Sequence, residues 1–499
     1  MADLETKNSA VATEESGERK VKMRSLALDL VPMGSDEENR MADLKVNKTL
    51  PEGIESKMLY SDIIHIAWPS LVELTLTQLA SMVDLMMVGQ LGPWALTAVG
   101  LTTQPKFLLM TMFMAMNVGA TAMVARYKGA GNQKKADEVL RQALLMTFVL
   151  GCVFALIGFI AAPWLIKFMG ASEDHVLQGG VDYLRIQMIG LPGLALTSTI
   201  TATLRGVGNS KTAMIYNAMA NIINVIFNYM LIYGNFGAPR MEVAGASLAT
   251  IIGQYCAMFM AFYAVMNGQQ YIILRFRDGF KPNKEEIKKI VDIGAPAMVE
   301  QVVMRIGLII YTRTVAGLGT LPYAVHQVCL NIQSLSFMNG QAFAVSATSL
   351  TGQSLGKKRH DMAQAYTTRT RKLGMCVSIF LGVVFFFFGG QIVALYSGGD
   401  QSLVELGAVI MMFVAVVQPF QSSQLILAGA LRGAGDTKVT AAITFITVLL
   451  VRPALAIFAI NVLGMGLEGA WYALVTDQIL RSLLVLLRYN SGAWKRHTM

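Results

Sequence analysis

The chain has 499 residues, of which 54% are hydrophobic and 15% charged, and its formal net charge is +9. Soluble proteins carry roughly 25% charged residues, so this composition indicates a polytopic α-helical membrane protein and excludes an ordinary soluble domain. The basic excess lies in short loops between apolar segments. It therefore reflects membrane topology, and we expect no nucleic-acid partner.

Residues 1–57 differ in composition from the rest of the chain. They are polar, mixed in charge sign and lack the 7–15-residue apolar core of a signal peptide. Segments of low hydrophobicity cannot bury enough apolar surface to fold alone. We therefore expect a disordered cytoplasmic tail over residues 1–57.

Twelve apolar segments that are each long enough to cross a bilayer follow the tail. Basic residues crowd the loops after the even-numbered spans and are scarce in the odd ones, so both termini are expected in the cytoplasm and the chain in the inner membrane. The predicted spans are 62–90, 97–125, 139–162, 181–204, 211–233, 244–266, 286–316, 323–351, 372–396, 404–430, 438–461 and 468–489.

The chain contains an internal repeat. IAWPSLVE from Ile66 matches IGAPAMVE from Ile293, and LRGVGNSKT from Leu204 matches LRGAGDTKV from Leu431, both with a separation of 227 positions. Two six-span halves have the same orientation and are related by an axis along the membrane normal. The sequence therefore predicts an all-α protein of two six-helix lobes, 58–268 and 269–499, around a cavity that opens to each side in turn.

The first span, within Ile63 to Gly92, carries a narrow polar stripe. Glu73 and Asp84 fall within about 20° of each other on a helix, beside Thr77 and Ser81. A carboxylate at membrane depth costs several kcal/mol unless it faces water, an ion or a partner, so it marks a functional site. The alternative is that both acids pair with buried basic groups.

The fifth span carries an asparagine row with steps of four, three and four residues: Asn217, Asn221, Asn224 and Asn228. These steps place all four amides on one helical face. Amide and carboxylate oxygens suit a hard cation such as Na⁺. The sequence therefore predicts a coupling site for Na⁺ or H⁺ at Asp84, Asn224 and Asn228, with Glu73 beside it and no other metal or cofactor. The alternative is an amide ladder that only joins helices.

These features together resemble the multidrug and toxic compound extrusion (MATE) transporters, over roughly residues 60 to 490. The resemblance rests on Pro69, Val83, Asp84, the segment from Gly89 to Gly92, LRGVGNSKT from Leu204, the Asn224 and Asn228 pair, the segment from Leu231 to Gly234, and the second LRG from Leu431. It implies a V-shaped fold, drug–cation antiport and an N-lobe ion site at the matched positions. Some members of the family have a second aspartate at the position of Asn228. With an asparagine there, this chain resembles the NorM-like branch.

The resemblance also implies that the first span bends at Pro69 when an ion binds; Pro296 is its repeat equivalent. A static kink is the alternative.

The second half departs from this pattern. Tyr311 stands opposite Asp84, and Met304 and Gln421 occupy the places where NorM-like relatives have C-lobe acids. Glu300 is either a replacement acid or the counter-ion of an arginine. We favour an ion pair with Arg305 or Arg313, because an unpaired arginine in a span is costly.

We therefore expect a secondary active transporter that exports small lipophilic cations, is not an enzyme and acts as a monomer among membrane lipids. The alternative is a lipid-linked precursor flippase, which needs a basic cavity. Candidate cavity residues are Asn217, Asn221, Glu300, Tyr311, Gln327, Asn331 and Gln421.

Overall fold

The computed structural model describes residues 25–35, 39, 50–171, 173–396 and 400–496, in which all long elements are helices. Asn132, Asn209 and Asp400 start helices by accepting hydrogen bonds from the first turn, as N-cap residues do. The helices are α3 (Ser56–Gly89), α4 (Pro93–Gly129), α5 (Gln133–Phe168), α6 (Asp174–Gly206), α7 (Ser210–Tyr233), α8 (Glu242–Met266), α9 (Lys284–Ala316), α10 (Thr320–Gly356), α11 (His360–Ala394), α12 (Gln401–Gly433), α13 (Thr437–Thr444), a π-helical segment (Phe445–Val451), α14 (Arg452–Asn461) and α15 (Gly466–Asn490).

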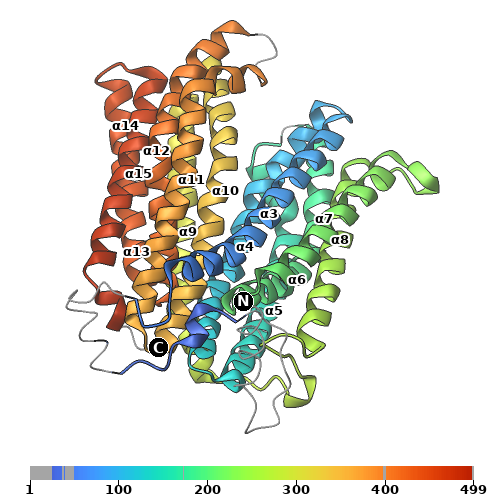
Figure 1. Cartoon of the computed structure of the whole chain (residues 1–499). Helices are drawn as coiled ribbons and strands as arrows, with labels where there is room; N and C mark the ends of the chain where they lie inside the picture. Colours follow the sequence, from blue (N-terminus) through green and yellow to red (C-terminus); the bar gives the residue numbers. More distant parts are fainter. Residues whose placement is uncertain (1–24, 36–38, 40–49, 172, 397–399, 497–499) are drawn as a thin grey trace.

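The twelve predicted membrane helices are confirmed, with α13, the π-helical segment and α14 forming one span. Ten spans are long and apolar enough to cross a membrane, while α6 and α10 are as long but more polar. α3 to α8 form one bundle and α9 to α15 the other (Figure 1). The bundles lie close together where α3 begins and diverge toward the opposite end, which gives the V shape.

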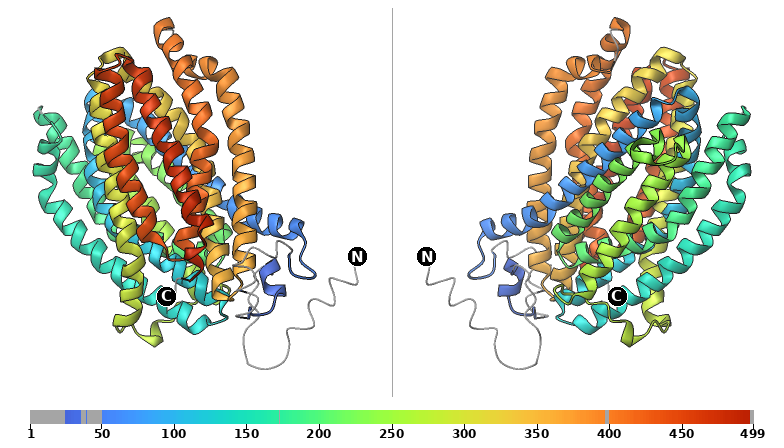
Figure 2. Two further views of the ribbon diagram at one scale, coloured as in Figure 1. Left: turned by 90° about the vertical axis from the view of Figure 1, so that its left-hand side faces the viewer. Right: turned by 90° about the vertical axis from the view of Figure 1, so that its right-hand side faces the viewer.

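The two bundles repeat one another by rotation. Figure 2 places the α5–α6 hairpin, in teal, and the equivalent α11–α12 hairpin, in orange, on opposite sides of the molecule. The lobes meet where α4 contacts α9 and where α10 contacts α3 and α4. The arrangement is the one expected for two halves related by an axis along the bundles.

Two repeat-related glycines set the closest approach of the lobes. A Cβ on Gly129 of α4 would lie 1.8 Å from the Gln353 carbonyl oxygen of α10. A Cβ on Gly356 of α10 would lie 1.9 Å from the Arg126 carbonyl oxygen of α4. Both neighbours are backbone atoms, so the seam tolerates no side chain at either position.

We expect Gly129→Ala and Gly356→Ala each to destabilise the protein by about 1–3 kcal/mol, because the added methyl group forces the lobes apart. Thermal unfolding of the purified protein in detergent measures this. Gly100→Ala on the same α4 is the control, since a Cβ there meets nothing within 4 Å. Equal stability of Gly129→Ala and Gly100→Ala would contradict the close approach at the seam.

Part of the N-terminal tail is folded. Leu26, Leu28 and Val31, in or beside the short 3₁₀ helix Ala27–Leu30, are at most 3% exposed and pack in a cluster with residues of α3, α10 and α11. The prediction of disorder is therefore wrong for residues 25–35, because these apolar side chains find a surface to cover. Residues 1–24, 36–38 and 40–49 of the predicted tail lie outside the described residues.

Buried Asp62 of α3 holds this segment. Its Oδ2 accepts hydrogen bonds from the Ala27 backbone N–H at 2.8 Å and from the Tyr366 hydroxyl of α11 at 2.9 Å. Lys357, directly after α10, donates to the Leu28 carbonyl oxygen at 2.8 Å. The segment thus bridges the beginning of α3 to the C-lobe.

Asp62→Ala is expected to cost about 1–3 kcal/mol, because it leaves two buried donors without this acceptor. We also expect faster proteolysis of residues 25–35, measured by limited digestion and mass spectrometry. Tyr366→Phe, which removes one donor and leaves the acceptor in place, should have a smaller effect. Unchanged stability and unchanged cleavage in Asp62→Ala would show that the carboxylate does not hold the segment.

Candidate functional site

Asp84 of α3 lies against the asparagine row of α7. The Asn228 amide donates a hydrogen bond to Asp84 Oδ1. The Asn224 amide satisfies its surroundings only with its nitrogen toward the carboxylate, where it lies 2.8 Å from Oδ1 and 3.1 Å from Oδ2. Its oxygen then accepts from the backbone N–H and hydroxyl of Thr250. The structure therefore brings together the three residues predicted from the sequence.

α3 and α7 run parallel and in register. The three contacts Asn217–Glu73, Asn221–Thr77 and Asn228–Asp84 each join residues 144 positions apart. The spacing of the asparagines matches the spacing of the polar stripe, since both helices repeat every 3.6 residues. The asparagine row of α7 therefore contacts the polar stripe of α3 from Glu73 to Asp84.

Asp84 is more exposed than the two amides that contact it. Asn228 is 0% and Asn224 6% exposed, whereas Asp84 is half-buried. Asn228 Oδ1 is buried and has no hydrogen-bond partner among the described residues. A carboxylate beside an unsatisfied amide oxygen is a donor set that fits a small hard cation or a proton.

Glu73 lies in a different environment on the same helix. It forms a salt bridge with Arg205 of α6 at 2.7 Å and accepts a hydrogen bond from Asn217 at 2.6 Å. A carboxylate that is paired in this way is already neutralised. The alternative, in which the acids of the stripe pair with basic groups, therefore holds for Glu73. Asp84 is in none of the described ion pairs.

Glu300 of α9 forms the repeat-equivalent pair. It contacts Arg432 of α12 at 2.8 Å, and Arg205 and Arg432 occupy the same place in the two LRG motifs. The ion pair that the sequence favours is present, but the partner is neither Arg305 nor Arg313. Arg305 instead stacks on the Phe107 ring of α4, 3.4 Å from its centroid.

A family model described as MatE matches residues 69–230 and 296–458, which together make up more than half of the chain. The chain belongs to the MATE family. The two matched stretches fall in the two halves of the sequence repeat and contain the acids Glu73 and Glu300. This MATE protein is therefore a multi-pass membrane transporter, and the family is not one of enzymes.

Curated relatives span nearly the whole transporter. A protein of Thermotoga maritima named "Probable multidrug resistance protein NorM" is 27% identical over 439 residues, 88% of this chain and 94% of its own. The "Uncharacterized transporter YisQ" of Bacillus subtilis is 26% identical and covers 87% of this chain and 94% of its own.

Solved MATE structures share the fold. A structure titled "Outward-facing conformation of a multidrug resistance MATE family transporter of the MOP superfamily" aligns with a TM-score of 0.81 at 21% identity, covering 87% of this chain and 96% of that one. "Crystal structure of MATE in the bent conformation" aligns with a TM-score of 0.80 at 22% identity, covering 88% and 96%.

The other predicted cavity residues of this MATE transporter are divided between core and surface. Tyr311 is 0% exposed and its hydroxyl donates to the Ala470 carbonyl oxygen at 2.8 Å, so it packs in the C-lobe core. Gln421 is buried, Gln327 is half-buried and Asn331 is exposed. Pro69 and Pro296 lie within α3 and α9, each of which is a single helix.

Two charged features were missed or only partly anticipated. Arg452, at the end of the π-helical segment, pairs with Asp477, which Arg481 also approaches at 3.5 Å. Within this cluster only Asp477 and Arg481 lie on one helix, with a four-residue spacing that the sequence itself shows. Lys106, a lone lysine inside the predicted span 97–125, donates a hydrogen bond to Gln187 Oε1 of α6 at 2.6 Å. The signal in the sequence is a charged residue inside an apolar span, which marks a candidate functional position.

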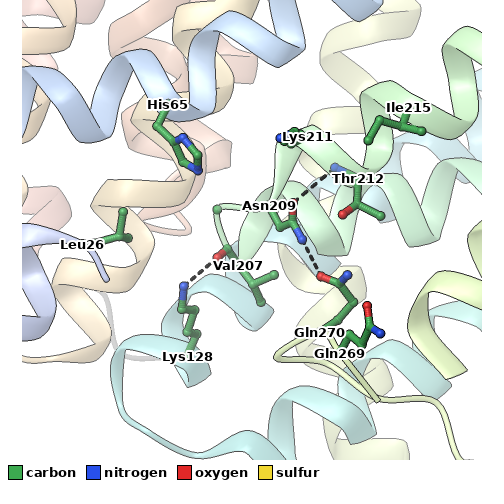
Figure 3. Close-up of a pocket in the computed structure, with 11 residues that line it drawn as sticks. Leu26, His65, Lys128, Val207, Asn209, Lys211, Thr212, Ile215, Gln269 and Gln270 are labelled. Carbon is green, nitrogen blue, oxygen red and sulfur yellow. Dashed lines mark hydrogen bonds between the residues drawn. The ribbon is translucent and has the colours of Figure 1, made fainter. Parts of the chain in front are cut away.

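A pocket of about 400 Å³ lies where α4 ends and α7 begins, away from Asp84 (Figure 3). Leu26 of the N-terminal segment forms part of its wall. Two hydrogen bonds join residues of its wall: Lys128 donates to the Val207 carbonyl oxygen at 2.6 Å, and Asn209 donates to Gln270. Asp84, Asn224 and Asn228 do not line this pocket.

Proposed function

We propose that this MATE transporter exports organic cations in exchange for Na⁺ or H⁺, with both cations using Asp84 and the lobes opening alternately. The observation that carries the proposal is the half-buried Asp84 beside the unsatisfied Asn228 oxygen. Glu73 and Glu300 are held in ion pairs, so Asp84 is the acid that remains for exchange in the described N-lobe stripe.

The one-sided distribution of the site supports an exchange centre in the N-lobe. The repeat positions of Asp84, Asn224 and Asn228 are Tyr311, Val451 and Leu455, none of which carries a carboxylate or amide. The close seam at Gly129 and Gly356 gives the lobes a point about which to rock. Pro69 lies between that end and Asp84 and supplies a place where α3 can bend.

Small lipophilic cations are the substrates that this site favours. A carboxylate at membrane depth attracts positive charge, and relatives carry the name multidrug resistance protein NorM. α3 begins and α15 ends at the same end of the molecule (Figure 1), beside the basic loops. This arrangement supports our proposal that both termini lie in the cytoplasm and that the transporter lies in the inner membrane.

Ethidium movement in everted membrane vesicles from a host without its own drug pumps tests this proposal. We expect uptake into the vesicles to require an imposed Na⁺ or H⁺ gradient and to stop when an ionophore collapses that gradient. Transport that persists without either gradient would overturn the antiport mechanism.

The flippase alternative rests on Arg305, whose guanidinium lies between the lobes on Phe107. A pyrophosphate headgroup needs such a cation. Rescue of a flippase-depleted strain by the wild type, but not by Arg305→Met, would favour it over cation export.

A further inference from the structure

Arg305 of α9 and Phe107 of α4 form a direct contact between the lobes. The guanidinium carbon of Arg305 lies over the face of the Phe107 ring, 3.4 Å from the ring centroid. Both side chains are half-buried, and they belong to different lobes. A cation in this position is attracted by the negative face of the π-system. The lobes are therefore joined here by a charge that rests on an aromatic ring.

The contact lies away from the close seam, toward the end where the lobes diverge. A Cβ on Gly119 of α4 would lie 2.3 Å from the Ile290 carbonyl oxygen of α9, so the two backbones touch there. Phe107 precedes Gly119 along α4, whose last residue lies at the seam, and Arg305 follows Ile290 along α9. Toward the open end of the V (Figure 1), tight backbone packing thus gives way to a contact between two side chains.

The ring is the one partner described for the Arg305 guanidinium. Arg432 and Arg452, which also belong to the C-lobe, are paired with carboxylates. Arg305 has no hydrogen bond or ion pair among the residues that the structure describes. A charge within a membrane span is costly without a partner. The face of Phe107 is therefore what stabilises this cation.

The sequence repeat does not duplicate this contact. The repeat equivalents of Phe107 and Arg305 are Ser334 and Gln78, which are neither aromatic nor charged. The ion pairs of the two LRG motifs, by contrast, are present in both lobes. A contact that the second lobe lacks is not required to build a lobe, which favours a role in what passes between the lobes.

The chemistry of the guanidinium indicates which ligands the ring can accept. A guanidinium is planar, spreads its charge over several atoms and is weakly hydrated, so it stacks readily on aromatic faces. Planar organic cations with delocalised charge, such as ethidium, share these properties and present a larger surface for stacking. A ring face that holds Arg305 therefore suits such a cation as well.

We propose that the face of Phe107 is the stacking platform for the transported organic cation, and that Arg305 occupies this platform until the cation arrives. The inference rests on the proposed function, since it assumes that organic cations are exported, and it narrows their class to planar aromatic cations. Phe107 binds the substrate, and Arg305 competes with the substrate for the ring. The exchange is non-covalent and requires only that the arginine side chain turn away.

Equilibrium binding of ethidium to the purified transporter, followed by fluorescence at one pH and ionic strength, tests the inference. We expect Phe107→Leu to bind ethidium about tenfold more weakly, because the ring face is lost. Arg305→Met should bind it about tenfold more tightly, because the competing cation is gone. In Phe107→Leu/Arg305→Met the second substitution should bring no tightening, since no ring remains to compete for.

Three matched variants separate the platform from general effects. Phe107→Tyr keeps a ring and should bind ethidium as the wild type does. Phe148→Leu removes another phenylalanine of the N-lobe, 46% exposed on α5, and should leave binding unchanged. Arg313→Met neutralises the exposed arginine at the end of α9 and should also leave it unchanged.

A general repulsion between Arg305 and any cation would tighten binding equally with and without the ring. Tightening of that kind, no tightening by Arg305→Met, or unchanged binding in Phe107→Leu would each overturn the platform. The proposed function would still stand if Asp84→Asn lost ethidium transport. Transport by Asp84→Asn at the wild-type rate, with weaker binding in Phe107→Leu, would instead remove the exchange at Asp84 and keep the platform.

Discussion

Replacing Asp477 with alanine is expected to destabilise the protein by about 3–5 kcal/mol. Asp477 is 0% exposed, and its carboxylate is paired with Arg452 and approached by Arg481, which are both buried. Its removal leaves two guanidinium groups with no described carboxylate partner inside the C-lobe bundle. The measurement is thermal or denaturant-induced unfolding of the purified protein.

A matched control distinguishes the loss of this buried, paired carboxylate from the general effect of removing an acidic side chain. Glu405→Ala removes an exposed carboxylate from α12 and should change the stability by no more than about 0.5 kcal/mol. In Asp477→Ala/Arg452→Met, removal of one orphaned cation should recover part of the loss. If Asp477→Ala is as stable as Glu405→Ala, the three charges do not stabilise the lobe.

Asp84→Asn is expected to lower gradient-driven ethidium transport at least about tenfold, because the substitution removes the charge that binds the exchanged cations. The asparagine has nearly the same shape and remains within reach of the Asn224 and Asn228 amides. The fold should therefore survive, and the initial rate of transport at equal protein level is the measurement.

Asp182→Asn is the control for this prediction, since it neutralises another partly exposed aspartate of the same lobe. We expect its transport rate to match that of the wild type. Equal rates for Asp84→Asn and the wild type would exclude the carboxylate from the exchange.

The sequence predicted the N-lobe cluster because its residues follow one helical period on two helices. The asparagine steps on α7 matched the polar stripe on α3, so contact between them required only that the helices be neighbours. The internal repeat predicted the two lobes in the same way. Both inferences used spacing within single helices.

The ion-pair partners were not predictable on that basis. Arg205 and Arg432 lie 132 positions from their glutamates, at helix ends that read as ordinary basic loops. Arg305 and Arg313, the partners that the sequence favours for Glu300, lie on the same helix as Glu300, whereas tertiary packing supplies Arg432 from α12. The repeat pairs Tyr311 with Asp84 and so predicts a cavity position, but its large ring is buried in the C-lobe core.

The N-terminal segment shows a further limit. Its average composition is typical of disorder, but Leu26, Leu28 and Val31 meet a buried surface that includes Asp62 and Tyr366. Whether a few apolar residues in a polar tail fold depends on a surface formed by distant parts of the chain.

The most direct test of cation exchange at Asp84 is to drive it backwards. Purified transporter in liposomes receives an ethidium gradient without any ion gradient, and pH- and Na⁺-sensitive dyes follow the lumen. We predict that H⁺ or Na⁺ moves opposite to ethidium in the wild type and that this movement disappears in Asp84→Asn. Ethidium flux with no opposing cation movement, or the same exchange in Asp84→Asn, would contradict the account.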